Sequence, residues 1–229
     1  MGETRESEFA VAKLSHSIPT TPWRATSPWS FRPRMAAPLI GGLTLFGIGE
    51  GLLVAAHWGA APWTVFAQGI SAKTGLAIGV STALVSFVVL LAWIPLRERP
   101  GLGTIANLVL IATALDVTVS TIGPHHAFVV RVVFVAAAIE LIALGSALYL
   151  TTGLGPGPRD GLMTSLHRRF GVSVVYVRTA LEGSVLLVGW LLGGVVGVST
   201  ALFAVGIGFA IGWNLKMVAA LATRIRVAP

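Results

Sequence analysis

Apolar residues run along most of this chain in long stretches, not in the short alternating or striped patterns of soluble domains. About 20 helical residues are needed to cross the hydrocarbon core of a bilayer. Six stretches approach that length, and the second contains no charged residue: residues 35–56, 76–96, 102–122, 128–150, 172–192 and 195–215. The pattern predicts an all-α, polytopic membrane protein with six transmembrane helices.

The two ends of the chain break this pattern. Residues 1–34 hold Pro19, Pro22, Pro28 and Pro33 among Ser, Thr and Arg, with no apolar run that could form the core of a signal peptide. We therefore expect an uncleaved, largely disordered basic tail over residues 1–34. A second, short basic tail is expected over residues 216–229, which leaves residues 35–215 as the transmembrane domain.

Composition supports a membrane protein and excludes several other classes. Of 229 residues, 55% are hydrophobic and 11% are charged, whereas soluble domains carry about 25% charged residues. The absence of cysteine excludes thiol catalysis, disulfides and Cys-ligated metals. A formal net charge of +7 would suit a nucleic-acid binder, but the basic residues do not gather on aromatic-interleaved or amphipathic elements. We expect the lipid bilayer as a partner, and no nucleic acid.

The positions of the basic residues predict the orientation. If the N-terminus is cytoplasmic, nearly all Lys and Arg residues fall on inner segments, Arg178 lies just inside the fifth span, and the outer side receives only Lys73 and Arg131. This positive-inside bias predicts a multi-pass protein of the plasma (inner) membrane with both termini in the cytoplasm. It also accounts for the isoelectric point near 11.1 without a nucleic-acid partner.

An ungapped offset of 96 residues aligns the two halves of the chain. It places Gly49 on Gly145, Gly59 on Gly155, Pro62 on Pro158, Gly75 on Gly171 and Gly101 on Gly197. Chance would give about one Gly–Gly match in such a window. Each half, about residues 35–122 and 128–215, holds three spans, so the second half would enter the membrane from the opposite side. The prediction is a 3+3 inverted repeat, which is frequent in transporters, although such units also occur in membrane proteins that transport nothing.

Each half also contains a short segment between its first two spans. Backbone breaks are expected there at Gly59, Pro62, Gly155, Pro156, Gly157 and Pro158. Proline suits the first position of a helix, so a short helix should follow each break. These two helices are either re-entrant, with N-termini facing an anionic ligand, or interfacial and flat. The flat arrangement is favoured for the second because Arg168 and Arg169 suit an inner membrane surface.

Ionisable residues inside apolar spans are energetically costly and are therefore candidate functional groups. Glu140 and Glu182 fall near the middle of their spans. Arg178 lies four residues before Glu182, so the two side chains share a helix face and can form a pair. Glu140 has no partner nearby in the sequence, and a lone carboxylate in a low dielectric favours its protonated form. Glu140 is therefore a candidate protonatable or cation-coupled site.

Five further residues complete the candidate substrate or ion path: Glu50, Asn107, Asp116, Arg159 and Asp160. Asp116 and Arg131 both lie toward the outer side and are expected to pair between helices. Such pairs can equally be closed structural contacts that hold helices together. The histidines lack metal-ligand spacing, and no hydrolase, zincin or phosphate-loop motif is present. We therefore expect no catalytic residue, metal or cofactor, and no enzyme activity.

Short motifs between about residues 41 and 209 match a known family. The most specific is the run GPGPRDGLM over residues 155–163, followed by Arg178 and Glu182; Pro62-Trp63 and the GLGT run at residues 101–104 also match. In these motifs the chain resembles the YczE branch of the YczE/YyaS/YitT family of bacterial membrane proteins. The resemblance implies an integral plasma-membrane protein. The first-half motif of the family commonly reads Pro-Trp-Asp, so Thr64 here leaves Asp160 as the only acid at the paired position.

These features predict a carrier or exporter of an unknown small molecule, either a small solute or a lipid-linked intermediate, with its path between the two repeats. The alternative is a membrane scaffold or accessory subunit of another membrane complex, which the basic inner segments and glycine-faced helices would serve equally well. A homo-oligomer or a membrane-complex partner is compatible with either function.

Overall fold

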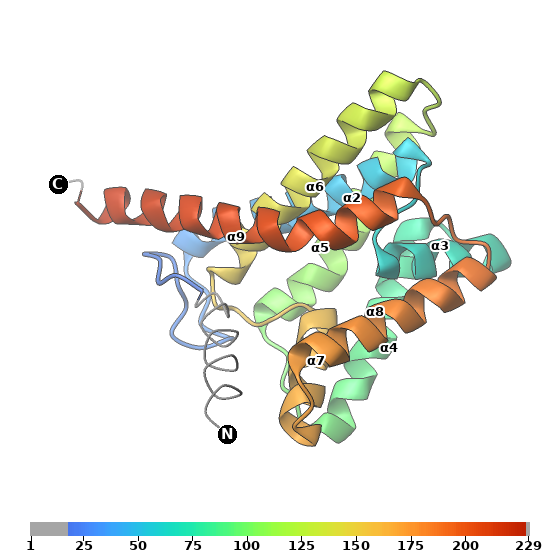
Figure 1. Cartoon of the computed structure of the whole chain (residues 1–229). Coiled ribbons are helices and arrows are strands. Elements are labelled where there is room, and N and C mark those ends of the chain that lie inside the picture. Colours follow the sequence, from blue (N-terminus) through green and yellow to red (C-terminus); the bar gives the residue numbers. More distant parts are fainter. Residues whose placement is uncertain (1–17, 228–229) are drawn as a thin grey trace, which may run out of the picture.

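The computed structural model describes residues 18–227, and all regular structure in that range is helical (Figure 1). Its elements are the short helical turns η1 (Pro33–Met35) and η2 (Ala37–Gly41), then α2 (Gly42–Ala56), α3 (Pro62–Thr74), α4 (Ile78–Leu96), α5 (Leu102–Ile122), α6 (Phe128–Leu150), α7 (Pro158–Phe170), α8 (Val174–Leu191) and α9 (Val198–Val227). Six helical segments are long and apolar enough to cross a membrane, the first running from Pro33 to Ala56. The all-α membrane fold predicted from the sequence is confirmed.

Close glycine contacts hold α2 against α6 at the centre of the molecule. A Cβ atom on Gly42 would lie 2.8 Å from the carbonyl oxygen of Gly145, and one on Gly49 would lie 2.8 Å from that of Ala138. Only residues without a bulky side chain let two helix backbones approach so closely. Leu53 of α2 and Ile142 of α6 fill the core beside these contacts. The buried cluster that contains Leu53 and Ile142 therefore lies at the interface between α2 and α6, the first helices of the two halves.

The elements of the two halves recur at the offset of 96 residues, and so do the contacts between them. The α3 and α7 helices begin at Pro62 and Pro158. The N–H of Gly103 donates to the Leu154 carbonyl at 2.8 Å, and the N–H of Ser199, the equivalent of Gly103, donates to the Trp58 carbonyl at 2.9 Å. Each bond joins the start of a third span to the loop before the short helix of the other half. The inverted arrangement across a bilayer stays a prediction that these reciprocal bonds support.

The described part of the N-terminal segment is fixed to the helical domain, contrary to the disorder expected for residues 1–34. The indole Nε1 of Trp23 donates to the Thr151 hydroxyl at 3.1 Å, and the N–H of Ala25 donates to the Thr152 carbonyl at 2.7 Å. The expectation was wrong for residues 18–34 because this segment pairs with polar groups of the loop after α6, which composition alone does not reveal. Residues 1–17 lie outside the described residues.

The C-terminal helix is longer than the span expected from hydropathy. The hydropathy predicts a span that ends at Leu215 and is followed by a basic tail, whereas α9 continues to Val227. Val218 and Ala222 are buried in this extension, and Val218 joins a cluster with Ala147. Side-chain packing therefore continues the helix beyond the predicted end of the apolar run.

The two halves differ in the position of their second span. In the first half α4 packs on α5, and the N–H of Gly79 donates to Asp116 Oδ1 at 3.1 Å. The equivalent residues in the second half are Val175 and Gly212, and glycine offers no carboxylate for this bond. Figure 1 shows α8 and α9 diverging from the loop that joins them, and α8 lies against α3 and α7 instead. A groove of about 1050 Å³ occupies the space between α8 and α9.

Candidate functional site

A cavity of about 300 Å³ lies where the first turns of α3 and α7 come together. Its wall includes Pro62 and Trp63 of α3 and Pro158, Arg159 and Asp160 of α7. This volume is at the lower end of the range found for small-molecule sites. The two short helices predicted from the sequence therefore both contribute their first residues to the wall of one cavity.

The backbone of each half is built to bring a helix start to the cavity. Gly59 and Gly155 have φ values of +106° and +111°, which favour glycine, and a proline opens each helix three residues later. The first turn of α3 is buried, whereas the first turn of α7 alternates between buried residues (Pro158, Gly161) and the more accessible Arg159 and Asp160. Whether the second short helix is flat or re-entrant stays a prediction, but one side of it packs inside the protein through Leu162, Met163 and Ser165.

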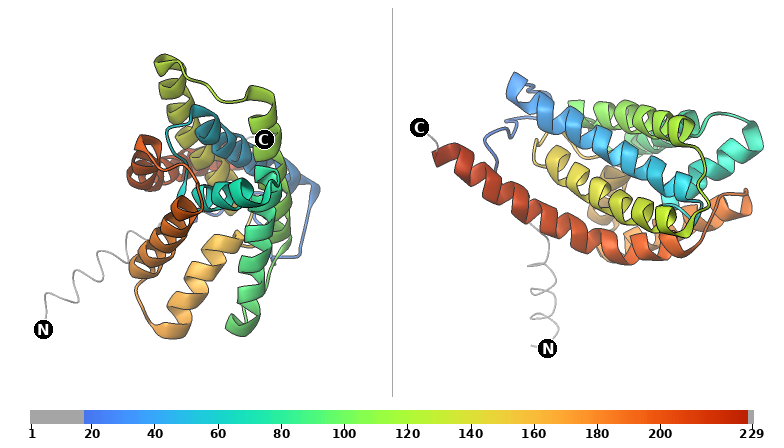
Figure 2. Two further views of the ribbon diagram at one scale, coloured as in Figure 1. Left: turned by 90° about the vertical axis from the view of Figure 1, so that its right-hand side faces the viewer. Right: turned by 90° about the horizontal axis from the view of Figure 1, so that it is seen from above.

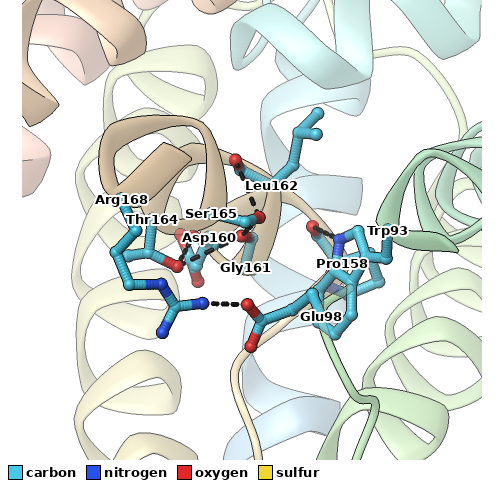
Figure 3. A network of polar contacts seen from close by, with 9 residues as sticks. All are labelled: Trp93, Glu98, Pro158, Asp160, Gly161, Leu162, Thr164, Ser165 and Arg168. Carbon is cyan, nitrogen blue, oxygen red and sulfur yellow. Dashed lines mark hydrogen bonds and ion pairs between the residues drawn. The ribbon is translucent and has the colours of Figure 1, made fainter. Parts of the chain in front are cut away.

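The start of α7 is held by α4 (Figure 3). The indole Nε1 of the buried Trp93 donates to the Pro158 carbonyl at 3.1 Å, and Gly161 lets the Trp93 ring pack directly on the α7 backbone. At the other end of α7, Arg168 forms an ion pair with Glu98. These contacts fix the helix at both ends and so fix the positions of Arg159 and Asp160.

Glu50 is the most deeply buried acid of the cavity, with 1% of its side chain exposed. Arg159 Nη1 lies 3.6 Å from Glu50 Oε1, and the Thr64 hydroxyl donates to Glu50 Oε2. The Arg159 guanidinium also lies over the Trp63 ring, 5.4 Å from its centroid. This cluster joins α2, α3 and α7, and the sequence predicted its acid and its base without predicting that they pair.

Asp160 has a different environment from Glu50. The hydroxyl of the buried Tyr149 donates to Asp160 Oδ2 at 2.9 Å. Within the described part of the chain, no Lys, Arg or His nitrogen lies within 4.0 Å of the Asp160 carboxylate. Asn107 lies beside this helix start, since a Cβ on Gly157 would be 3.0 Å from Asn107 Nδ2. Sequence analysis missed Tyr149, although a tyrosine near the end of an otherwise apolar span is a signal that could have found it.

Arg178 and Glu182 form the predicted pair on α8, with Arg178 Nε 2.9 Å from Glu182 Oε1. Both residues line the central cavity, and both also line the groove between α8 and α9. Glu140 lies on the groove and not on the cavity, and Asn214 Nδ2 donates to its Oε1 at 2.9 Å. The Asn214 contact could not be expected from the sequence, because the two residues are 74 positions apart.

Asp116 does not join the cavity or pair with Arg131. Its Oδ1 accepts from the N–H of Gly79 at the start of α4, whereas Arg131 donates to the His125 carbonyl at 2.7 Å and lies over Trp58. The predicted pair is wrong because Asp116 faces α4, while Arg131 contacts His125 of the loop before α6 and Trp58 of the loop before α3. Among residues 18–227, no group of His, Asp and Glu side chains is arranged to hold a metal ion.

Residues 34–216 match the sequence model of a family of unknown function, DUF6198. The chain belongs to this family. Its DUF6198 region covers every residue of the cavity and the groove described above. The family assignment therefore includes the whole candidate site.

Relatives of this DUF6198 protein include proteins of two bacteria. An uncharacterized protein of Haemophilus influenzae is 46% identical over 211 residues, covering 92% of this chain and 97% of the relative. The uncharacterized membrane protein YczE of Bacillus subtilis is 28% identical over 180 residues, covering 76% of this chain and 82% of the relative. YyaS of the same organism is 22% identical over 165 residues. The resemblance to the YczE branch is confirmed, and no solved structure matches the chain.

Proposed function

We propose that this membrane protein carries a small solute across the plasma membrane and binds it in the central cavity. The observation that carries the proposal is the convergence of the α3 and α7 helix starts, one from each half, on a cavity lined by Glu50, Arg159 and Asp160. Broken helices that meet at a binding site between two repeats are typical of secondary transporters. Charged groups at such depth are costly and are retained in membranes mainly for function.

The proposed orientation places both chain ends in the cytoplasm. The segment holding Arg24 and Arg34 lies at the same end of the molecule as the last turns of α9, where Arg224 is found (Figure 2). The α3 helix and the start of α6, which carry Lys73 and Arg131, lie toward the opposite end of the molecule (Figure 2). The excess of basic residues at one end supports a cytoplasmic location for that end.

We propose α8 as the element that opens and closes the path. Only 6% of its span is buried in the protein, compared with 44% for its counterpart α4. Because Arg178 and Glu182 line both the cavity and the groove, a displacement of α8 would change the access to both. An element with little buried contact area is the one expected to move at low energetic cost.

Cysteine accessibility tests the proposal directly, because the natural chain contains no cysteine. Ser146 lines the cavity and is 4% exposed, so Ser146→Cys reports on access to the site. In alternating access, a membrane-impermeant thiol reagent modifies this cysteine both in right-side-out and in inside-out vesicles. The exposed Ser27 lies in the N-terminal segment, so Ser27→Cys should react only in inside-out vesicles. The exposed Ser120 lies in the last turn of α5, so Ser120→Cys should react only in right-side-out vesicles.

A Ser146→Cys variant that reacts from one side alone, or from neither, would contradict a carrier. That result would favour the second candidate function, a scaffold or accessory subunit of a membrane complex. The observation that favours this second function is the exposed apolar surface of α8 and α9, which includes Leu187, Trp190 and Phe209. Stoichiometric co-purification with one larger membrane partner would support it.

A further inference from the structure

We infer that the ligand of the central cavity is a small, largely apolar organic cation, such as a quaternary ammonium ion or a substituted amine. This inference rests on the cavity described above and gives a chemical class to the solute of the proposed carrier. The charge balance of the cavity, the Asp160 carboxylate without a cationic partner and the aromatic wall support it.

The charged groups of the cavity do not balance. Three acids line it, Glu50, Asp160 and Glu182, and two bases, Arg159 and Arg178. With every group in its ordinary ionised form, the wall carries one excess negative charge. In a low-dielectric site an uncompensated charge is costly, so a cation in the cavity is favoured and an anion is disfavoured.

The excess charge can be placed on Asp160. Glu50 faces Arg159 and Glu182 faces Arg178, whereas Asp160 accepts a hydrogen bond from the neutral Tyr149 hydroxyl and has no cationic partner among the described residues. The Asp160 side chain is also exposed at the cavity wall. A carboxylate that is accessible and lacks a counter-charge is the group to which a ligand cation would bind.

The rest of the wall suits an organic cation better than a hydrated metal ion or a sugar. Four aromatic side chains line the cavity: Phe46, Trp63, Tyr149 and Phe203. Trp63 already faces the Arg159 guanidinium, which leaves the other three rings to a ligand. Aromatic faces beside a carboxylate form the usual recognition site for substituted ammonium groups. The remaining wall is largely aliphatic, including Ile111, Ile142 and Ile207, and accommodates an apolar substituent.

Binding of benzyltrimethylammonium to the purified full-length protein tests the inference, with phenylacetate as the anionic probe of similar size. Isothermal titration calorimetry should detect the cation and not the anion. Asp160→Asn should weaken cation binding by about tenfold or more, since it removes a charge-assisted contact. Asp116→Asn is the matched control, because Asp116 lies outside the cavity. This variant should bind benzyltrimethylammonium with the same affinity as the unmodified protein.

A second variant keeps the test decisive if Asp160→Asn does not fold. Phe203→Leu should weaken binding by about threefold or more by removing one aromatic face, and Phe203→Tyr should retain it. The inference is overturned if the unmodified protein does not bind the cation, if phenylacetate binds equally well, or if neither Asp160→Asn nor Phe203→Leu changes the affinity.

Transport is measured separately, so that the two proposals can fail independently. Proteoliposomes on a solid-supported membrane should give a current when benzyltrimethylammonium is added. Binding without a current would keep the cation site and overturn the carrier. If benzyltrimethylammonium does not bind but Ser146→Cys is modified from both sides, the inference of a cationic ligand is overturned and the proposed carrier function is retained.

Discussion

Among the residues of the cavity, Glu50 is the one whose side-chain contacts hold both short helices in place. It is almost fully buried, and its partners Arg159 and Thr64 come from the two short helices. Removing one member of a buried ion pair leaves the other as an uncompensated charge, which costs far more than the pair itself contributes. The pair therefore links the folding of α2 to the correct placement of α3 and α7.

A double-mutant cycle should reveal this dependence. Arg159→Gln should lower stability by about 3 kcal/mol, because it leaves the buried Glu50 charge unpaired. Glu50→Gln should cost less, because the Arg159 side chain that it leaves is 19% exposed. The double variant should lose less than the sum of the two single losses. Thermal unfolding in detergent measures all four proteins.

The ion pair of Glu98 with the exposed Arg168 serves as the control for that cycle. The Arg168 side chain is 62% exposed, so Glu98→Gln, which leaves only this accessible charge unpaired, should cost no more than about 1 kcal/mol. Additive losses in the Glu50 and Arg159 cycle would mean that the two charges do not interact in the folded protein.

At the scale of the elements, the short helices depend on the glycine before each proline. The Gly59 and Gly155 loops pack on the starts of α9 and α5, where Thr200 and Thr104 hold the helix N-termini. A Cβ on Gly155 would lie 2.9 Å from the Thr104 hydroxyl, and one on Gly59 would collide with the Thr200 hydroxyl. Each loop therefore carries both a glycine-favouring backbone conformation and a close contact with the other half.

Alanine at either glycine should destabilise the protein by a similar amount, more than about 2 kcal/mol, because backbone strain and overpacking add. Gly75→Ala and Gly171→Ala isolate the strain, since both positions have positive φ but open space around them. These controls should cost about 1–2 kcal/mol in thermal unfolding. Equal losses at all four positions would mean that the contact with the other half contributes nothing.

At the scale of the whole molecule, the two halves are joined mainly by helix contacts and not by the loop between them. The α2 and α6 helices meet through Gly42 and Gly145, and α3 and α7 each pack on a helix of the other half. A chain cut in the loop of residues 123–127 retains all of these contacts. The halves should therefore assemble when made as separate pieces.

Co-expressed fragments 1–124 and 125–229 should purify together from membranes. Gly145→Leu should abolish their association, because a side chain there would strike the Gly42 carbonyl and Phe46 of the other fragment. Gly183→Leu is the control, since nothing lies within 4 Å of a Cβ at that position. If Gly145→Leu fragments still co-purify, the glycine contact is not what joins the halves.

The sequence by itself determined the helical spans, the offset of 96 residues and the two short helices opened by Pro62 and Pro158. These features are readable because span length, glycine placement and proline at a helix start are local properties of the chain. It also singled out the charged residues that the cavity contains. Even the pair of Arg178 and Glu182 was predictable, because four residues along a helix place two side chains on one face.

Only the tertiary structure decided which of these groups meet. The pairing of Glu50 with Arg159, the contact of Asn214 with Glu140 and the Tyr149 bond that leaves Asp160 without a cation all join residues from different helices. Asp116 was misassigned for the same reason, since the partner at Gly79 comes from a neighbouring helix. Such contacts depend on how each helix is rotated about its axis and on the angle at which two helices cross, and close glycine packing fixes the rotation and the angle. The sequence pattern of a single span therefore cannot predict them.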